Sequence, residues 1–148
     1  MKRILVTGGL GYVGSHTCVA LIEAGYHPIV VDNLRNTRFE TKKAIENITG
    51  QSLEFYEIDA KNTQEVAEKI GHTDGTIHFA ALKSVSESIE NPMEYYSENL
   101  ESLLSIIEVS ATTGAKSFIF SSSATVYGET KKECVSEETP LGTPLNPY

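Results

Sequence analysis

Short apolar runs alternate with longer amphipathic stretches along this chain of 148 residues. Five of the runs are rich in branched or aromatic residues and end at glycine or a polar residue, which is typical of strands buried in a parallel sheet. The predicted strands are residues 3–7, 28–32, 53–58, 76–79 and 117–120. This regular alternation predicts an α/β protein.

Helices are predicted between the strands, where apolar residues recur at helical spacing. The first is expected to stop at Gly25, and its apolar face consists of Val13, Thr17, Ala20, Leu21 and Ala24. Two shorter helices are expected at 38–48 and 63–70, and Thr63 is the expected N-cap of the second. The positions of that helix expected to face inward are Val66 and Ile70.

A much longer helix is predicted over residues 92–113, opened by Pro92 and stopped by Gly114. Its expected apolar stripe consists of Leu100, Leu103, Leu104 and Ile107. The sequence after Gly128 is expected to be a loop, because prolines break any regular element there. These prolines are Pro140, Pro144 and Pro147.

The first strand runs into a glycine-rich turn that leads directly into the first helix. Gly8, Gly11 and Gly14 form this turn, and Asp32 ends the second strand eighteen residues after Gly14. Glycines allow backbone N–H groups to approach a pyrophosphate at a helix N-terminus, and the acid can accept hydrogen bonds from ribose hydroxyls. The complete unit predicts a dinucleotide site, and Asp32 favours NAD over NADP.

Five strands separated by helices predict a doubly wound parallel sheet with strand order 3-2-1-4-5. We expect an NAD-binding Rossmann-type domain over residues 1–128 and a loop over residues 129–148. Ligands of such sheets bind at the carboxyl ends of the strands, where the polar residues of this chain lie. Strand 117–120 is expected to present an apolar open edge that promotes self-association.

Composition agrees with a soluble intracellular enzyme, which we expect to be cytoplasmic. The formal charge of −8 argues against nucleic-acid binding, and neither a membrane span nor a signal peptide is expected. Cys18 and Cys134 are expected to be free thiols. The histidines show no metal-ligand spacing and suggest no catalytic role; they are His16, His27, His72 and His78.

Four segments together resemble the UDP-glucose 4-epimerases, a family of extended short-chain dehydrogenases/reductases. The segments are Thr7-Gly8-x-x-Gly11-x-x-Gly14, Asp32-Asn33-Leu34, His78-Phe79-Ala80-Ala81-Leu82-Lys83 and Ser121-Ser122-Ser123-Ala124-Thr125-Val126-Tyr127-Gly128. The resemblance covers the whole chain. Related dehydratases typically carry an Asp-Glu pair where this chain has Ala124-Thr125, so the resemblance implies epimerisation and not dehydration.

The resemblance implies a reaction that interconverts UDP-glucose and UDP-galactose through a 4-keto sugar, with tightly bound NAD. Tyr148 matches the base that takes the proton of the sugar 4-hydroxyl, and Ser123 matches the hydroxyl that supports this transfer. No metal is implied. The residues that match cofactor-binding positions are Gly8, Gly11, Tyr12, Val13, Gly14, Asp32, Asn33, Leu34, Asn36, Thr37, Asp59, Ala60, Phe79, Ala80, Ala81, Leu82, Lys83, Asn99 and Ser121.

The family's catalytic motif continues from the tyrosine to a lysine four residues later, and this chain stops at Tyr148. Free phenols are only about 0.1% ionised at pH 7, and the lysine normally helps to lower the phenol pKa. We therefore expect an N-terminal cofactor-binding part that lacks the substrate domain and does not epimerise UDP-galactose alone. Tyr148 itself is expected to be a frayed terminal residue. The full-length enzymes are commonly homodimers.

Two alternative interpretations stay open from the sequence. One is a non-catalytic module that binds NAD without a sugar nucleotide. The other is a different NAD-dependent sugar-nucleotide epimerase or dehydratase on the same scaffold. The preferred sugar is decided by residues that this sequence does not contain.

Overall fold

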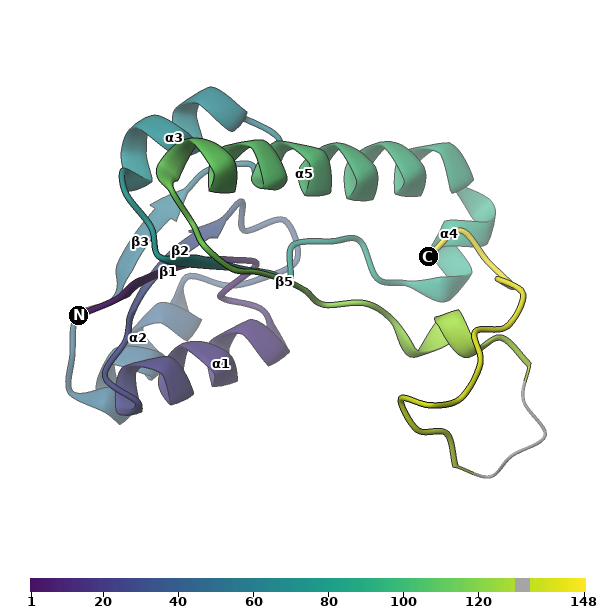
Figure 1. The fold of residues 1–148 in the computed structure, drawn as a ribbon, viewed down its shortest axis with the longest axis horizontal. Helices are drawn as coiled ribbons and strands as arrows, with labels where there is room; N and C mark the ends of the chain where they lie inside the picture. The colour runs from purple at the N-terminus through teal and green to yellow at the C-terminus, as the bar shows by residue number, and fades with distance from the viewer. Residues whose placement is uncertain (130–133) are drawn as a thin grey trace.

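The computed structural model describes residues 1–129 and 134–148 and contains a five-stranded parallel sheet (Figure 1). Its order, β3-β2-β1-β4-β5, confirms the predicted topology. The strands are β1 (Arg3–Thr7), β2 (His27–Asp32), β3 (Glu54–Glu57), β4 (Gly75–His78) and β5 (Phe118–Phe120). The central strand β1 pairs with β2 and β4, so Val6 lies between Val30 and Ile77.

Two layers of helices cover the two faces of the sheet (Figure 1). One layer contains α1 (Tyr12–Glu23) and α2 (Glu40–Thr49), and the other contains α3 (Thr63–Ile70) and α5 (Pro92–Thr113). Alternate residues of β1 point to opposite layers: Leu5 packs in the cluster with Ile106, and Val6 packs in the cluster with Cys18. The central strands are therefore apolar on both faces, as the uninterrupted runs predicted.

The face of α1 that packs against the sheet differs from the predicted one. Gly14, Cys18 and Ile22 are buried, whereas Val13 is 56% exposed. The reason is the tight turn before the helix: a Cβ at position 14 would lie 2.3 Å from the Gly8 carbonyl oxygen. This close approach sets the rotation of α1, and Val13 then faces outward.

The predicted apolar stripe of α5 was also wrong. Leu100, Leu104 and Ile107 are each about half exposed or more, and Leu103 is half-buried. The buried face of this helix consists of Tyr95, Ser102, Ser105, Ile106, Val109, Ser110 and Thr113. Its small hydroxyl residues bond neighbouring elements, as in the 2.7 Å contact between the Ser110 and Thr76 hydroxyls. The buried face of this helix therefore combines core apolar residues with small hydroxyl residues that bond neighbouring elements.

Three local features were not predicted correctly. The N-cap of α3 is Asn62 and not Thr63, because the Asn62 side chain accepts a hydrogen bond from the Glu65 amide. A short helix, α4 (Val85–Glu90), and a 3₁₀ turn, η1 (Ala124–Tyr127), occupy segments for which no helix was predicted. Elements this short leave little periodicity in a sequence.

The cysteines and the edge strand agree with expectation. Cys18 and Cys134 are free, and burial raises the pKa of the Cys18 thiol to about 12. Ile119 and Phe120 on the edge strand β5 are more than half exposed, in agreement with an apolar open edge.

None of the helices within the described ranges combines the length and apolar character needed to cross a membrane.

Candidate functional site at the carboxyl ends of the strands

The glycine turn between β1 and α1 lies directly against the segment after β4. Gly8 adopts a positive φ of 66°, and a Cβ there would lie 2.7 Å from the Ala80 amide nitrogen. α1 starts at Tyr12, and no described side chain caps its first turn. The turn therefore leaves helix N–H groups available to an anion and has no room for larger residues.

Asp32 ends β2 beside this turn, with 5% of its surface exposed. Its Oδ1 accepts hydrogen bonds from the Leu34 amide at 3.0 Å and the Thr37 hydroxyl at 2.6 Å. Its Oδ2 accepts one from the Leu10 amide at 3.1 Å. A carboxylate offers about four acceptor positions, so one position on Oδ2 is left for a ligand. Leu34 itself has a φ of 57° and packs against the core beneath the loop.

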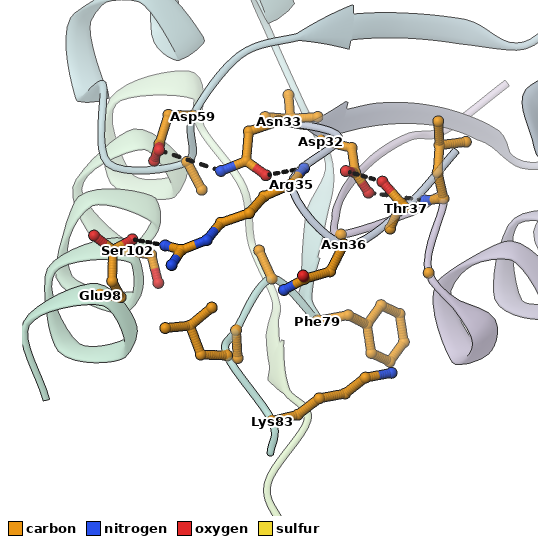
Figure 2. Close-up of a pocket in the computed structure, with 18 of the residues that line it drawn as sticks. Asp32, Asn33, Arg35, Asn36, Thr37, Asp59, Phe79, Lys83, Glu98 and Ser102 are labelled. Atoms are coloured by element: carbon orange, nitrogen blue, oxygen red, sulfur yellow. Dashed lines mark hydrogen bonds and ion pairs between the residues drawn. The ribbon is translucent and has the colours of Figure 1, made fainter. Parts of the chain in front are cut away.

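Asn33 links the loops that follow β2 and β3. Its side-chain amide donates to Asp59 at 3.2 Å and its carbonyl oxygen accepts from the Arg35 amide at 3.1 Å. Asp59 also accepts from the Lys61 amide at 2.9 Å. The two loops are therefore held side by side at the carboxyl end of the sheet, as Figure 2 shows.

Asn99 of α5 holds the segment after β4 in place. Its Oδ1 accepts from the Leu82 amide at 2.8 Å, and its Nδ2 donates to the Leu82 carbonyl at 3.0 Å. Two residues further on, the Ser84 amide donates to the Tyr95 hydroxyl at 3.0 Å. The pairing of Asn99 with a backbone amide shapes the wall of the site, which the sequence could not indicate.

Two adjoining cavities of about 420 and 680 Å³ lie between these loops. Sequence-predicted residues that line both are Gly8, Gly11, Tyr12, Phe79, Ala80, Ala81, Lys83 and Asn99. Those that line only the smaller cavity are Asp32, Asn33, Asn36, Thr37, Asp59, Ala60 and Leu82. Those that line only the larger cavity are Val13, Gly14, Ser121, Ser123 and Tyr148. Of the predicted residues, Leu34 alone lines neither.

The larger cavity brings together Ser123 and Tyr148. Ser123 Oγ accepts hydrogen bonds from the Thr125 amide at 3.1 Å and the Thr125 hydroxyl at 2.9 Å, so its own proton is left to donate elsewhere. The segment that leads to Tyr148 is held to η1, because the Gly142 amide donates a hydrogen bond to the Val126 carbonyl at 2.9 Å. Tyr148 is half-buried and lines the wall of this cavity.

Several residues of the site were missed from the sequence, above all His78. Its Nδ1 lies 2.7 Å from the Thr7 hydroxyl, and its ring stacks on Phe120. Burial lowers the pKa of His78 to about 4, so the ring is neutral near pH 7. It lines the larger cavity. Only its place at the end of a strand could have identified it.

The smaller cavity is also lined by charged residues that were not predicted, among them Arg35 and Glu98. Arg35 Nη2 lies 2.6 Å from Glu94 Oε1, and Lys61 Nζ lies 2.6 Å from Glu98 Oε1. The hydrogen bond from Lys61 to Glu98 raises the pKa of the lysine. Glu94 and Glu98 stand one helical turn apart on α5, a spacing that could have indicated a shared acidic face.

Known proteins are similar to this chain in sequence. A UDP-glucose 4-epimerase of Dictyostelium discoideum is 45% identical over 148 residues, which are 99% of this chain and 43% of the relative. One from Bacillus subtilis is 44% identical over 147 residues, which are 98% of this chain and 43% of the relative.

Solved structures agree with these relatives. UDP-glucose 4-epimerase from Bifidobacterium longum, in complex with NAD+ and UDP, has a TM-score of 0.94 and 41% identity to this chain. The match covers 99% of this chain and 44% of that one, so this chain spans less than half the length of the relatives it matches. The model of a family described as NAD dependent epimerase/dehydratase matches residues 4–148. With its glycine turn, its Asp32 and the serine and tyrosine of its larger cavity, the chain belongs to the NAD dependent epimerase/dehydratase family.

Proposed function

We propose that this chain binds NAD across the two cavities and supplies the cofactor-binding part of a UDP-glucose 4-epimerase. The observation that carries the proposal is the glycine turn. A Cβ at Gly8 would come too close to Ala80, and a Cβ at Gly14 would come too close to Gly8 in the turn itself. Such a cradle suits a pyrophosphate lying on backbone amides. The buried carboxylate of Asp32 adds an acceptor for a ribose hydroxyl.

The smaller cavity would hold the adenosine half of NAD. There, the remaining acceptor position of Asp32 would bind a ribose hydroxyl, and a 2′-phosphate would be repelled by the same charge. Asn36 and Thr37 would border the ribose, and Asp59 and Ala60 would border the adenine. Tyr12 and Val13 would lie beside the pyrophosphate.

The larger cavity would hold the reacting half of the complex. NAD, when bound, supplies the acceptor and donor of hydride for the sugar C4. Tyr148 would take the proton of the sugar 4-hydroxyl, and Ser123 would donate a hydrogen bond with the proton that its contacts to Thr125 leave available. These roles support interconversion of UDP-glucose and UDP-galactose through a 4-keto sugar.

Epimerisation is favoured over dehydration by the residues after Ser123. Ala124 lines the larger cavity, and Thr125 is occupied with the Ser123 hydroxyl. Neither residue has a carboxylic acid that could protonate a leaving hydroxyl. The named relatives, which are UDP-glucose 4-epimerases 45% and 44% identical to this chain, support the same choice.

We further propose that the full-length enzyme is a homodimer in which α5 contributes to the interface. Leu100, Leu104 and Ile107 form an exposed apolar row on this helix. Rows of this kind are typical of surfaces that associate. Sedimentation of the full-length protein with Leu104→Glu should show a shift toward monomer, and an unchanged dimer would contradict the role of α5.

Calorimetric titration of this chain with NAD, followed by UDP-glucose, tests the cofactor proposal. We expect NAD to bind with micromolar affinity or better. Asp32→Asn should weaken binding because it removes the charge that accepts the ribose hydroxyl. Asn36→Ala, at an exposed position of the same cavity, should weaken binding without affecting folding.

Glu57→Gln is the matched control, because Glu57 is exposed at the end of β3 and outside both cavities. Thermal unfolding of each variant separates loss of binding from loss of fold. Equal affinity for NAD in the wild type, Asp32→Asn and Asn36→Ala would contradict this site.

A further inference from the structure

An arginine of the loop after β2 reaches across the smaller cavity to the long helix. Arg35 Nη2 lies 2.6 Å from Glu94 Oε1, and Nη1 lies 3.7 Å from Glu98 Oε2. Figure 2 shows the extended side chain of Arg35 running from its loop toward the helix that carries Glu98 and Ser102. The two ends of this contact are 59 residues apart in the sequence.

Glu98 also joins the neighbouring loop to the same point on α5. Its Oε1 lies 2.6 Å from Lys61 Nζ, so one carboxylate is shared by cations from the loops after β2 and β3. Helix α3, which follows this second loop, is also tied to α5, because the Thr63 and Ser105 hydroxyls lie 2.8 Å apart. Among the described hydrogen bonds and ion pairs, the loop after β2 is tied to α5 through Arg35 alone.

Two of these charged residues border the proposed ligand site. Arg35 and Glu98 line the smaller cavity together with Asp32, Asn33 and Asp59. A nucleotide bound in this cavity would lie beside Arg35 and Glu98. We propose that Arg35, Glu94 and Glu98 form an ionic clasp that closes the adenosine end of the cleft and slows release of the nucleotide.

The exposed fractions of these side chains indicate whether the clasp affects folding or nucleotide release. Arg35 and Glu94 are 44% and 42% exposed, and Glu98 is 26% exposed. Pairs this exposed add little to folding stability and are screened by salt. The clasp therefore acts on the opening of one loop and makes nucleotide release dependent on ionic strength, while the fold does not depend on it.

The inference rests on the proposed NAD site and is tested by release kinetics. The wild-type chain is loaded with NADH and mixed with excess NAD in a stopped-flow instrument. The fluorescence of bound NADH then falls at the rate at which NADH is released. Arg35→Ala and the double variant Glu94→Gln/Glu98→Gln should each release NADH about five-fold faster, the factor that corresponds to an exposed ion pair at the upper end of its range.

Two further measurements distinguish a clasp from a direct contact between Arg35 and the nucleotide. In the triple variant, the effects of Arg35→Ala and the two glutamine substitutions should not multiply, because both ion pairs of Arg35 are already removed by the glutamine substitutions. Raising NaCl from 50 to 500 mM should accelerate release from the wild type more than from Arg35→Ala. Arg38→Ala is the matched control: Arg38 lines the same cavity, and the described residues include no ion pair between it and α5.

The outcomes separate the two proposals. Failure of the wild-type chain to bind NADH or NAD would overturn the NAD site and the clasp with it. Binding with equal release rates in the wild type, Arg35→Ala and the double glutamine variant would overturn the clasp alone. Fast release from Arg35→Ala with wild-type release from the double variant would also overturn it, because Arg35 would then act on the nucleotide directly.

Discussion

At the amino end of the sheet, charged residues satisfy one another. Glu54 accepts hydrogen bonds from Nη1 and Nη2 of Arg3 and from the Tyr56 hydroxyl, and it pairs with His27. Arg3 also donates to the Ile70 carbonyl at 2.9 Å. This cluster, made of Arg3, His27, Glu54 and Tyr56, ties together β1, β2 and β3.

At the carboxyl end, similar residues are arranged around open space. Asp32, Asn33 and Asp59 are each held by backbone or side-chain donors on one side and border the smaller cavity on the other. The difference teaches that residue type alone does not separate a structural cluster from a binding site. What separates them is whether the neighbouring chain occupies every hydrogen-bonding position.

The largest expected effect concerns His78, which belongs to the core and the larger cavity at once. Burial lowers its pKa from 6.5 to about 4, so protonation favours the unfolded chain. The stability that this neutral ring provides is present above pH 6.5 and is lost as the pH falls toward 4, by about 3 kcal/mol. Denaturant unfolding at several pH values should show a smaller loss in His78→Gln. Equal pH dependence in both proteins would contradict the prediction.

Gly14→Ala should break the carboxyl end by steric overlap. The added Cβ would lie 2.3 Å from the Gly8 carbonyl oxygen, so the turn must move, at a cost of about 2 kcal/mol in the free energy of unfolding. NAD binding measured by calorimetry should be lost even where the protein remains folded. Gly25→Ala is the control, because nothing lies within 4 Å of its added Cβ although its φ is 80°. NAD affinity equal to that of the wild type in Gly14→Ala would refute the cradle.

Glu54→Gln should weaken the amino end and spare the ligand. Burial by itself would raise the pKa of Glu54, but hydrogen bonds from His27, Arg3 and Tyr56 outweigh it and lower the pKa. The stabilisation is therefore present above the ordinary pKa of the carboxyl group and is lost as the pH falls below it. We expect unfolding by urea to show a loss of about 1 kcal/mol at pH 7 with unchanged NAD affinity.

Glu57→Gln on the same strand is the control for Glu54, because Glu57 is exposed. Its free energy of unfolding should stay within about 0.5 kcal/mol of the wild type. If Glu54→Gln weakened NAD binding as strongly as it weakened folding, the two ends of the sheet would not be functionally separate.

The smallest expected effect on stability is that of Glu94→Gln at the carboxyl end. Its contact with Arg35 is exposed, so we expect a change below about 0.5 kcal/mol in urea unfolding. A loss as large as that of Glu54→Gln would show that the clasp supports the fold, contrary to the comparison drawn above.

Much of the fold and part of the site could be predicted from the sequence. The strands, their order and the glycine turn follow from local features: apolar runs of strand length, helical spacing between them and glycines where backbone segments meet. Gly8, Gly14 and Asp32 were located by the same reasoning, because their spacing reflects a continuous stretch of chain. Resemblance to a known family added Ser123 and Tyr148, and the structure places both in one cavity.

The remaining features were decided by contacts between distant parts of the chain. The apolar residues Leu100, Leu104 and Ile107 predicted the wrong face of α5, because Ile106 and Val109 pack in the core on the face where Ser105 and Ser110 bond hydroxyls of α3 and β4. Similarly, the clasp at Arg35 joins residues 59 positions apart.

The sequence by itself thus determined the five strands, their order, the longer helices and the glycine turn. Tertiary structure decided which face of each helix is buried and which charged residues border the cleft. The physical reason is range: periodicity and turn chemistry act within a few residues, whereas burial, hydrogen-bond partners and pKa values depend on neighbours that only the folded chain brings together.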